Sequence, residues 1–168
     1  ALPPGMVHAI GAGLAVAEIQ QNSDVTFRIY DYKRLGLDGK PRQLHVKEAL
    51  HAIRFDEAGD EFAGDMQRET VLPLKQERTD GVTKELLLRG RYFDLERLSI
   101  AAGQHATLPA QPDAPRVLMA ISGSGKLGGR ILPAGQTVLL PAAMPAVELS
   151  AEKSDLVVLI STPTVVSC

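Results

Sequence analysis

A histidine near the start of the chain stands directly after a turn signal. His8 follows Pro4 and Gly5 in the run PPGMVH, and a rigid turn there would fix an imidazole at the start of a strand, in place to bind a metal. The alternative is a half-exposed histidine at a strand end, because imidazole serves both roles. The spacing alone leaves both interpretations open.

Glu18 and Arg28 belong to an unusually polar stretch within an otherwise apolar segment. Residues 13–32 alternate between apolar and polar side chains, which predicts a strand with one apolar face. Both positions share parity with His8, so in regular, paired strands a ligand, a carboxylate and a guanidinium could face one cavity. The alternative is a solvated loop at 20–24 with Arg28 in a surface ion pair.

Other potential metal ligands lie in a segment with helical apolar spacing, 44–53, which predicts a short helix. At about 100° per residue, His51 lies about 240° around such a helix from His45, so the two cannot converge on one ion. We expect His45, Glu48 and His51 to form a solvated helix face. We expect His105 to be exposed in a loop or at a strand end.

Charge and composition exclude several classes of partner. The chain has 168 residues with 18 basic and 20 acidic side chains, a net charge of -2, so nothing attracts it to nucleic acid or anionic lipid. Its apolar runs, such as 156–160, are far shorter than the roughly 20 residues that span a bilayer. We therefore expect neither nucleic acid nor membrane as a partner.

Two features favour a cytoplasmic location. Cys168 is the only cysteine, so an intrachain disulfide is impossible and a reducing compartment is compatible. The first residues show neither the basic nor the apolar region of a secretory signal. The cytoplasm is thus the expected compartment.

Short runs rich in Val, Ile and Leu, broken by turn signals roughly every 8 to 12 residues, predict a mostly β protein. Residues 1–53 form a first unit, 54–83 a polar connection, and 84–168 a unit with enough strands for a small barrel. The first unit supplies roughly two or three strands, too few to be stable alone. Either it packs on the second unit or its other strands precede residue 1.

Several motifs in the first unit resemble one known family. The run PPGMVHAIGAGLAVAEIQQNSDVTFRIYDYKR, followed by DGKPRQLHVKEAL, is similar to the short bacterial form of type I mannose-6-phosphate isomerase, a member of the cupin superfamily. The resemblance is dense over 3–53 and looser over 84–162. It implies a cupin-type double-stranded β-helix barrel for 84–168, and a partial cupin unit with a short helix for 1–53, the remnant of the catalytic cupin.

The resemblance also implies a zinc-dependent enzyme that interconverts mannose 6-phosphate and fructose 6-phosphate. The histidine of the first motif, here His8, would be a zinc ligand, Arg28 the catalytic arginine, and Glu18 part of the active-site wall. Lys33 and Arg34 are candidates for contact with the phosphate. The family's other zinc ligands, a Gln-x-His pair and a glutamate, precede this histidine, so the resemblance implies a fragment that lacks most of the metal ligands.

A second function remains open beside this one. A chain with so few ligands is also compatible with a catalytically silent cupin that binds a sugar phosphate or a protein partner. The later barrel segments carry no histidine where a cupin ligand would stand, so 84–168 is expected to be metal-free. A half-barrel with exposed strand edges pairs readily with another chain, which favours self-association.

Overall fold

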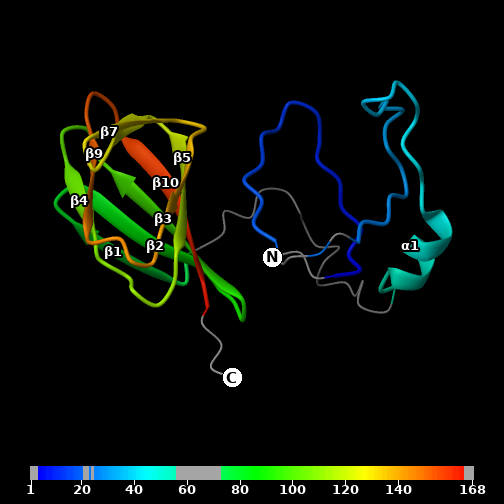
Figure 1. Ribbon diagram of the computed structural model, residues 1–168, viewed down its shortest axis with the longest axis horizontal. Helices are drawn as coiled ribbons and strands as arrows, with labels where there is room; N and C mark the ends of the chain where they lie inside the picture. Colours follow the sequence, from blue (N-terminus) through cyan, green and yellow to red (C-terminus); the bar gives the residue numbers. More distant parts are fainter. Residues whose placement is uncertain (1–3, 21–22, 24, 56–72, 165–168) are drawn as a thin grey trace. The chain divides into compact units, whose positions relative to one another are not determined.

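The computed structural model describes residues 4–20, 23, 25–55 and 73–164. The chain divides into two compact units, Ala1–Glu69 and Thr70–Cys168, which we call the N-terminal unit and the barrel unit. Figure 1 shows a unit of strands and a unit made mainly of loops with one helix. No helix within these ranges has the length and apolar character needed to cross a membrane.

The described part of the barrel unit forms two antiparallel sheets. One has six strands in the order β1-β2-β3-β10-β5-β8, and the other has four in the order β4-β9-β6-β7. The strands are β1 (Lys75–Thr79), β2 (Val82–Arg89), β3 (Phe93–Ile100), β4 (His105–Leu108), β5 (Arg116–Ser122), β6 (Ser124–Leu127), β7 (Arg130–Pro133), β8 (Thr137–Leu140), β9 (Val147–Ala151) and β10 (Leu156–Pro163).

The pairing of these strands is nested. β3 pairs with β10, β4 with β9, β5 with β8 and β6 with β7, all antiparallel. A long hairpin that rolls up in this way, with its pairs alternating between two sheets, gives the jelly roll or double-stranded β-helix found in cupins. The two sheets face each other in Figure 1. The cupin-type barrel expected from the sequence is therefore confirmed.

An apolar core fills the space between the two sheets. In β10 every second residue from Leu156 to Ile160 is buried, and Leu118 and Ala120 of the neighbouring β5 are fully buried. This period of two places one face of each strand in the core. The cluster comprises Leu98, Ile100, Leu108, Leu118, Ala120, Leu127, Leu132, Leu140, Val147, Leu149, Ala151, Leu156, Val158 and Ile160.

The apolar pattern predicts that β structure resumes at Lys84. In the structure the first hairpin of the barrel unit begins earlier, with β1 at Lys75. All five side chains of β1 are exposed, so this strand has no alternation that a periodicity argument could detect. Its turn, by contrast, has a signal in the sequence, the pair Asp80 and Gly81. Both residues adopt positive φ, 41° and 77°. Asp-Gly is a preferred pair for a two-residue type I′ hairpin turn.

The N-terminal unit contains one short helix, α1 (Val46–Ala52), which confirms the helix predicted within 44–53. The strand predicted over 13–32 is wrong for the described positions 13–20, 23 and 25–32, none of which is in a strand. Alternating side chains do not make a strand unless a neighbour takes up its backbone hydrogen bonds. Within the described ranges of this unit the only β pairing is an isolated bridge between Leu35 and Pro41.

The two adjacent leucines of β8 test the packing of the barrel. Leu140 is 2% exposed and Leu139 is 63% exposed, because neighbours on a strand point to opposite faces. We expect Leu140→Ala to lower the free energy of unfolding by about 2–5 kcal/mol. We expect Leu139→Ala to change it by less than about 0.5 kcal/mol. Urea unfolding followed by circular dichroism measures both, and equal losses would contradict the described register.

Candidate functional site

A tight turn in the N-terminal unit positions several charged side chains. The backbone N–H of Arg34 donates to the carbonyl of Asp31 at 2.9 Å, which closes a four-residue turn. Its central residues, Tyr32 and Lys33, have φ of 51° and 58°, as in a type I′ turn. This region costs a residue with a side chain about 1–2 kcal/mol, so contacts around the turn must hold it in place.

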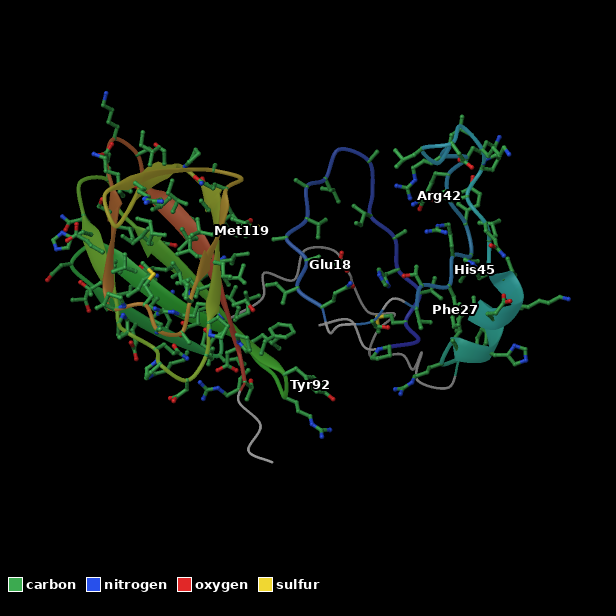
Figure 2. All side chains as sticks on the ribbon, viewed as in Figure 1. Glu18, Phe27, Arg42, His45, Tyr92 and Met119 are labelled. Carbon is green, nitrogen blue, oxygen red and sulfur yellow. The ribbon has the colours of Figure 1, made fainter. Side chains whose placement is uncertain are left out.

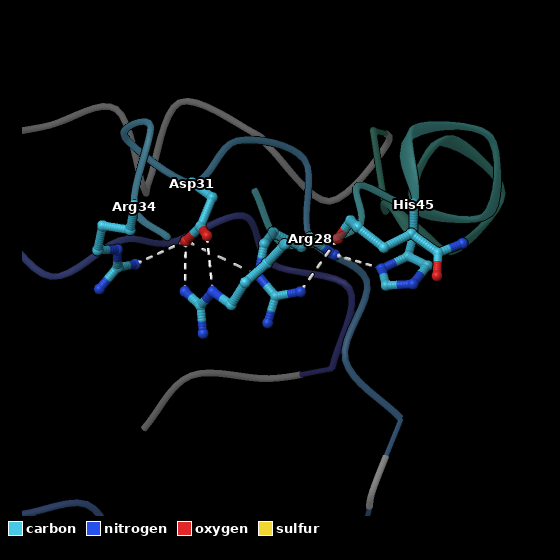
Figure 3. A network of polar contacts seen from close by, with 6 residues as sticks. Arg28, Asp31, Arg34 and His45 are labelled. Atoms are coloured by element: carbon cyan, nitrogen blue, oxygen red, sulfur yellow. Dashed lines mark hydrogen bonds and ion pairs between the residues drawn. The ribbon is translucent and has the colours of Figure 1, made fainter. Parts of the chain in front are cut away.

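The carboxylate of Asp31 is the centre of those contacts, as Figure 3 shows. The fork of Arg42 binds both carboxylate oxygens, with Nε donating to Oδ2 at 2.7 Å and Nη2 donating to Oδ1. Arg34 Nη2 donates to Oδ1 at 3.0 Å, and Arg28 Nε lies 3.8 Å from the same oxygen. Asp31 itself is buried, with 6% exposure. We call these four residues the Asp31 cluster.

The three arginines of the cluster differ in how far they reach solvent. The side chain of Arg28 is 23% exposed, that of Arg42 39% and that of Arg34 64%. Three guanidinium groups surround one carboxylate, so the cluster has an excess of positive charge. Planar guanidinium forks suit phosphate and carboxylate groups. The cluster therefore has the chemistry to bind an anion.

The hydrogen bonds from Arg42 set the ionisation of Asp31. They are the largest influence lowering the pKa of Asp31, which falls from 3.8 to about 2, and the charges of Arg42 and Arg34 lower the pKa further while burial opposes them. The same contact raises the pKa of Arg42. Asp31 is consequently ionised at neutral pH, and the ion pair with Arg42 is maintained.

A compact loop returns the chain from Arg34 to Arg42. Gly36 N–H donates to the carbonyl of Lys40 at 2.8 Å, and Lys40 N–H donates to Asp38 Oδ1 at 3.1 Å. The bridge between Leu35 and Pro41 lies at the base of this loop. The loop thus brings Arg42 back to a carboxylate eleven positions earlier.

Arg28 is anchored at the start of α1. Its backbone N–H donates to Nδ1 of His45 at 3.4 Å, and the backbone N–H of His45 donates to the carbonyl of Arg28 at 2.8 Å. Nη1 of Arg28 also donates to the carbonyl of Gln43 at 3.1 Å (Figure 3). The ring of Phe27 lies beside that of His45, with centroids 6.4 Å apart (Figure 2). These contacts hold Arg28 near Asp31.

The turn before His8 packs against the other end of α1. Gly5 has φ of 86°, and a Cβ added to it would lie 2.7 Å from the carbonyl oxygen of Ala52. Arg54 N–H donates to the carbonyl of Gly5 at 3.3 Å. This close approach explains why glycine stands at the turn. The turn predicted before His8 is confirmed, although the strand expected after it is absent from the described residues.

The imidazole of His8 is oriented by its own backbone. Nδ1 lies 3.0 Å from the carbonyl oxygen of Met6. Because a carbonyl only accepts, this contact requires the proton on Nδ1 and leaves the Nε2 lone pair for a ligand, an arrangement common in metal-binding histidines. Among the residues that the structure describes, no three His, Cys, Asp or Glu side chains are grouped to hold a metal ion. His8 fits a metal as one ligand, but these residues do not complete a site.

The structure brings together only some of the residues predicted for the site. Arg28 and Arg34 share Asp31, whereas Glu18 and Lys33 are exposed and have no hydrogen bond or ion pair within the described ranges. Figure 2 shows Glu18 on a different part of the N-terminal unit from Arg42. Asp31 and Arg42 were not predicted. The i,i+3 spacing of Asp31 and Arg34 is a detectable signal, but nothing local identifies Arg42.

The barrel unit also has a buried carboxylate, and its own arginine neutralises it. Arg97 Nε and Nη2 donate to the two oxygens of Glu85 at 2.6 and 3.0 Å, and Gln76 donates to it at 3.0 Å. The contact with Arg97 is the main cause that lowers the pKa of Glu85. Arg97 is the one guanidinium hydrogen-bonded to this carboxylate among the described residues, and the charge of Arg78 lowers the pKa of Glu85 further. Glu85 and Arg97 therefore form a structural ion pair between β2 and β3.

The pKa of Asp31 can be measured directly. A carboxyl whose pKa is lower in the folded state stabilises the fold above its unfolded pKa, and this contribution is lost as the pH falls through the folded value. We expect the carboxyl carbon of Asp31 to titrate by NMR with a midpoint of about 2, below its ordinary 3.8. Arg42→Gln should raise the midpoint towards 3.8. A midpoint that the substitution leaves unchanged would contradict the assigned cause.

The chain is similar to known proteins in both sequence and structure. No family model matches the chain. The putative mannose-6-phosphate isomerase YvyI of Bacillus subtilis is 33% identical over 148 residues, which cover 86% of this chain and 43% of the relative. Mannose-6-phosphate isomerase ManA of Bacillus subtilis is 34% identical over 145 residues, covering 83% and 42%.

A solved structure agrees with these relatives. The crystal structure of mannose 6-phosphate isomerase from Bacillus subtilis superimposes with a TM-score of 0.60 at 29% identity, covering 84% of this chain and 41% of that one. The chain therefore spans about two fifths of the length of the relatives that it matches. The resemblance predicted from the motifs is confirmed, and this chain is a homologue of the mannose-6-phosphate isomerases.

Proposed function

We propose that this chain is part of an enzyme that interconverts mannose 6-phosphate and fructose 6-phosphate. The observation that carries the proposal is the Asp31 cluster, with its excess of positive charge, in a chain whose curated homologues are mannose-6-phosphate isomerases. A sugar phosphate is an anion that such a cluster can bind through forked hydrogen bonds. We further propose that the enzyme acts in the cytoplasm.

The reaction makes two demands on the site. An aldose becomes a ketose when a proton moves between C1 and C2 through an enediol, so the site must stabilise a developing oxyanion and bind the phosphate. In this proposal Arg28, which is held between Gln43 and Asp31, stabilises the anionic intermediate. Arg34 and Lys33, both exposed on the Asp31–Arg34 turn, contact the phosphate. Glu18 orients water or the sugar hydroxyls.

We propose zinc as the cofactor, with His8 as one of its ligands. The free Nε2 of His8 supports this role. Bound zinc would supply a Lewis acid or a template for two sugar oxygens. A catalytic zinc takes about three protein ligands, and the described residues offer His8 alone, so no step of the reaction is assigned to the metal.

Zinc content tests the role of His8. In the protein as its gene encodes it, we expect about one zinc per chain by elemental analysis, and we expect His8→Ala to remove most of it. His51→Ala is the matched control, because His51 is also exposed and its Nδ1 also lies near a backbone carbonyl, that of Lys47, at 2.7 Å. Equal zinc in the two variants would remove His8 from the metal site.

Turnover tests the role of Arg28. In the same protein, we expect Arg28→Ala to lower kcat by roughly 100-fold or more, because a charge-assisted contact to the developing oxyanion is lost. Arg130→Ala, at an exposed arginine of β7, should leave kcat unchanged. A coupled assay for fructose 6-phosphate measures both, with circular dichroism to confirm the fold. A near-normal rate in Arg28→Ala would exclude Arg28 from the mechanism.

The same samples separate this function from the silent cupin. Isothermal titration with fructose 6-phosphate reports binding whether or not turnover follows. If the unsubstituted, zinc-loaded protein binds the sugar phosphate but does not convert it, the silent cupin is the better description.

A further inference from the structure

We propose that Asp31 and Arg42 form a positioning pair, which holds Arg28 and Arg34 ready for the anionic groups of the substrate without touching the substrate. The inference rests on the proposed function and adds two residues to it. Three arginines share the carboxylate of Asp31 unequally.

Arg42 makes the closest and most complete contact with Asp31. Its fork covers both oxygens, whereas Arg34 donates one hydrogen bond, at 3.0 Å, and Arg28 makes only an ion pair at 3.8 Å. Bidentate pairs between arginine and carboxylate are the strongest of these interactions. Arg42 therefore takes up most of the negative charge of Asp31.

The other two arginines keep donors that Asp31 does not use. A guanidinium has five N–H donors, and Arg34 spends one of them on Asp31. Its side chain is 64% exposed, the most of the three, so the remaining donors can reach an incoming anion. Arg28 is oriented by the carbonyl of Gln43 and by Asp31 together. Asp31 thus directs two cations whose charge Arg42 leaves free.

The turn itself supports the same interpretation. Tyr32 and Lys33 hold positive φ angles, which residues with a side chain rarely adopt. The tight turn that they form places Arg34 beside Asp31, three positions earlier in the sequence. The guanidinium of Arg34 also lies 6.0 Å from the ring centroid of Tyr32, within the range of a cation–π contact. Such a conformation persists where surrounding contacts over-determine it, and the fork of Arg42 on Asp31 is one such contact.

Removing Arg42 should therefore harm substrate binding indirectly. In Arg42→Gln, Asp31 keeps its charge but loses its bidentate partner. Its carboxylate then draws Arg34 and Arg28 closer and takes up the donors that they would otherwise offer to an anion. We expect KM for mannose 6-phosphate to rise roughly tenfold, with a smaller change in kcat, as for the loss of one charge-assisted hydrogen bond. In the double variant Asp31→Asn with Arg42→Gln, the amide oxygen of the asparagine can still accept the hydrogen bond from Arg34, but it has no net charge that would draw both guanidinium groups onto it. KM should therefore return to within roughly threefold of the unsubstituted protein.

This rescue separates positioning from two other roles. If Arg42 bound the substrate directly, adding Asp31→Asn would not restore KM. If the pair only stabilised the fold, thermal unfolding would change in step with activity and the KM-to-kcat split would vanish. The matched control is the ion pair between the exposed Arg89 and the half-buried Asp94 in the barrel unit, 3.3 Å apart, where Arg89→Gln with and without Asp94→Asn should leave KM unchanged.

Inorganic phosphate makes the test independent of catalysis. An inactive unsubstituted protein would overturn the proposed function, and the dissociation constant for inorganic phosphate would still report on the cluster. The positioning pair predicts weaker phosphate binding in Arg42→Gln and recovered binding in the double variant. Equal affinity in all three proteins, or no recovery in the double variant, would overturn it.

Discussion

Backbone hydrogen bonding is the constraint on which both units depend. Every buried N–H and C=O needs a partner, and the barrel unit meets this need by nesting its strand pairs, with β3 on β10 outermost and β6 on β7 innermost. Apolar side chains of alternate residues then fill the space between the sheets. Strand pairing thus satisfies the backbone of the barrel, and the packing of these side chains supplies its apolar burial.

The N-terminal unit satisfies the same need differently. Its described residues form turns, one bridge and one helix, and most of them are exposed, so water can satisfy the backbone groups that have no partner within the chain. Asp31 joins two loops through Arg34 and Arg42, while His45 joins Arg28 to the start of α1. A few charged contacts therefore fix the geometry that a sheet would otherwise provide. This is why the candidate site depends so strongly on one carboxylate.

Sequence reasoning succeeded where signals are local or periodic. The helical spacing of 44–53 predicted α1, and the apolar runs after Lys84 predicted the barrel strands. Alternation over 13–32 was misleading, because periodicity describes side chains and cannot show whether a neighbouring strand exists. The contact of Arg42 with Asp31 could not be predicted from the sequence, since it depends on how the loop between them folds back. The roles of His8, Glu18 and Arg28 stay predictions.

The exposed strand β1 has a consequence for solubility. It lies at one edge of the six-stranded sheet, where unpaired backbone groups invite a strand from another molecule. Its sequence, KQERT, places charged or polar side chains on both faces, and Lys75 and Glu77 pair with each other. Adding a strand here would require these charges to be desolvated. The edge that was hardest to recognise from hydrophobicity is, for the same reason, protected against aggregation.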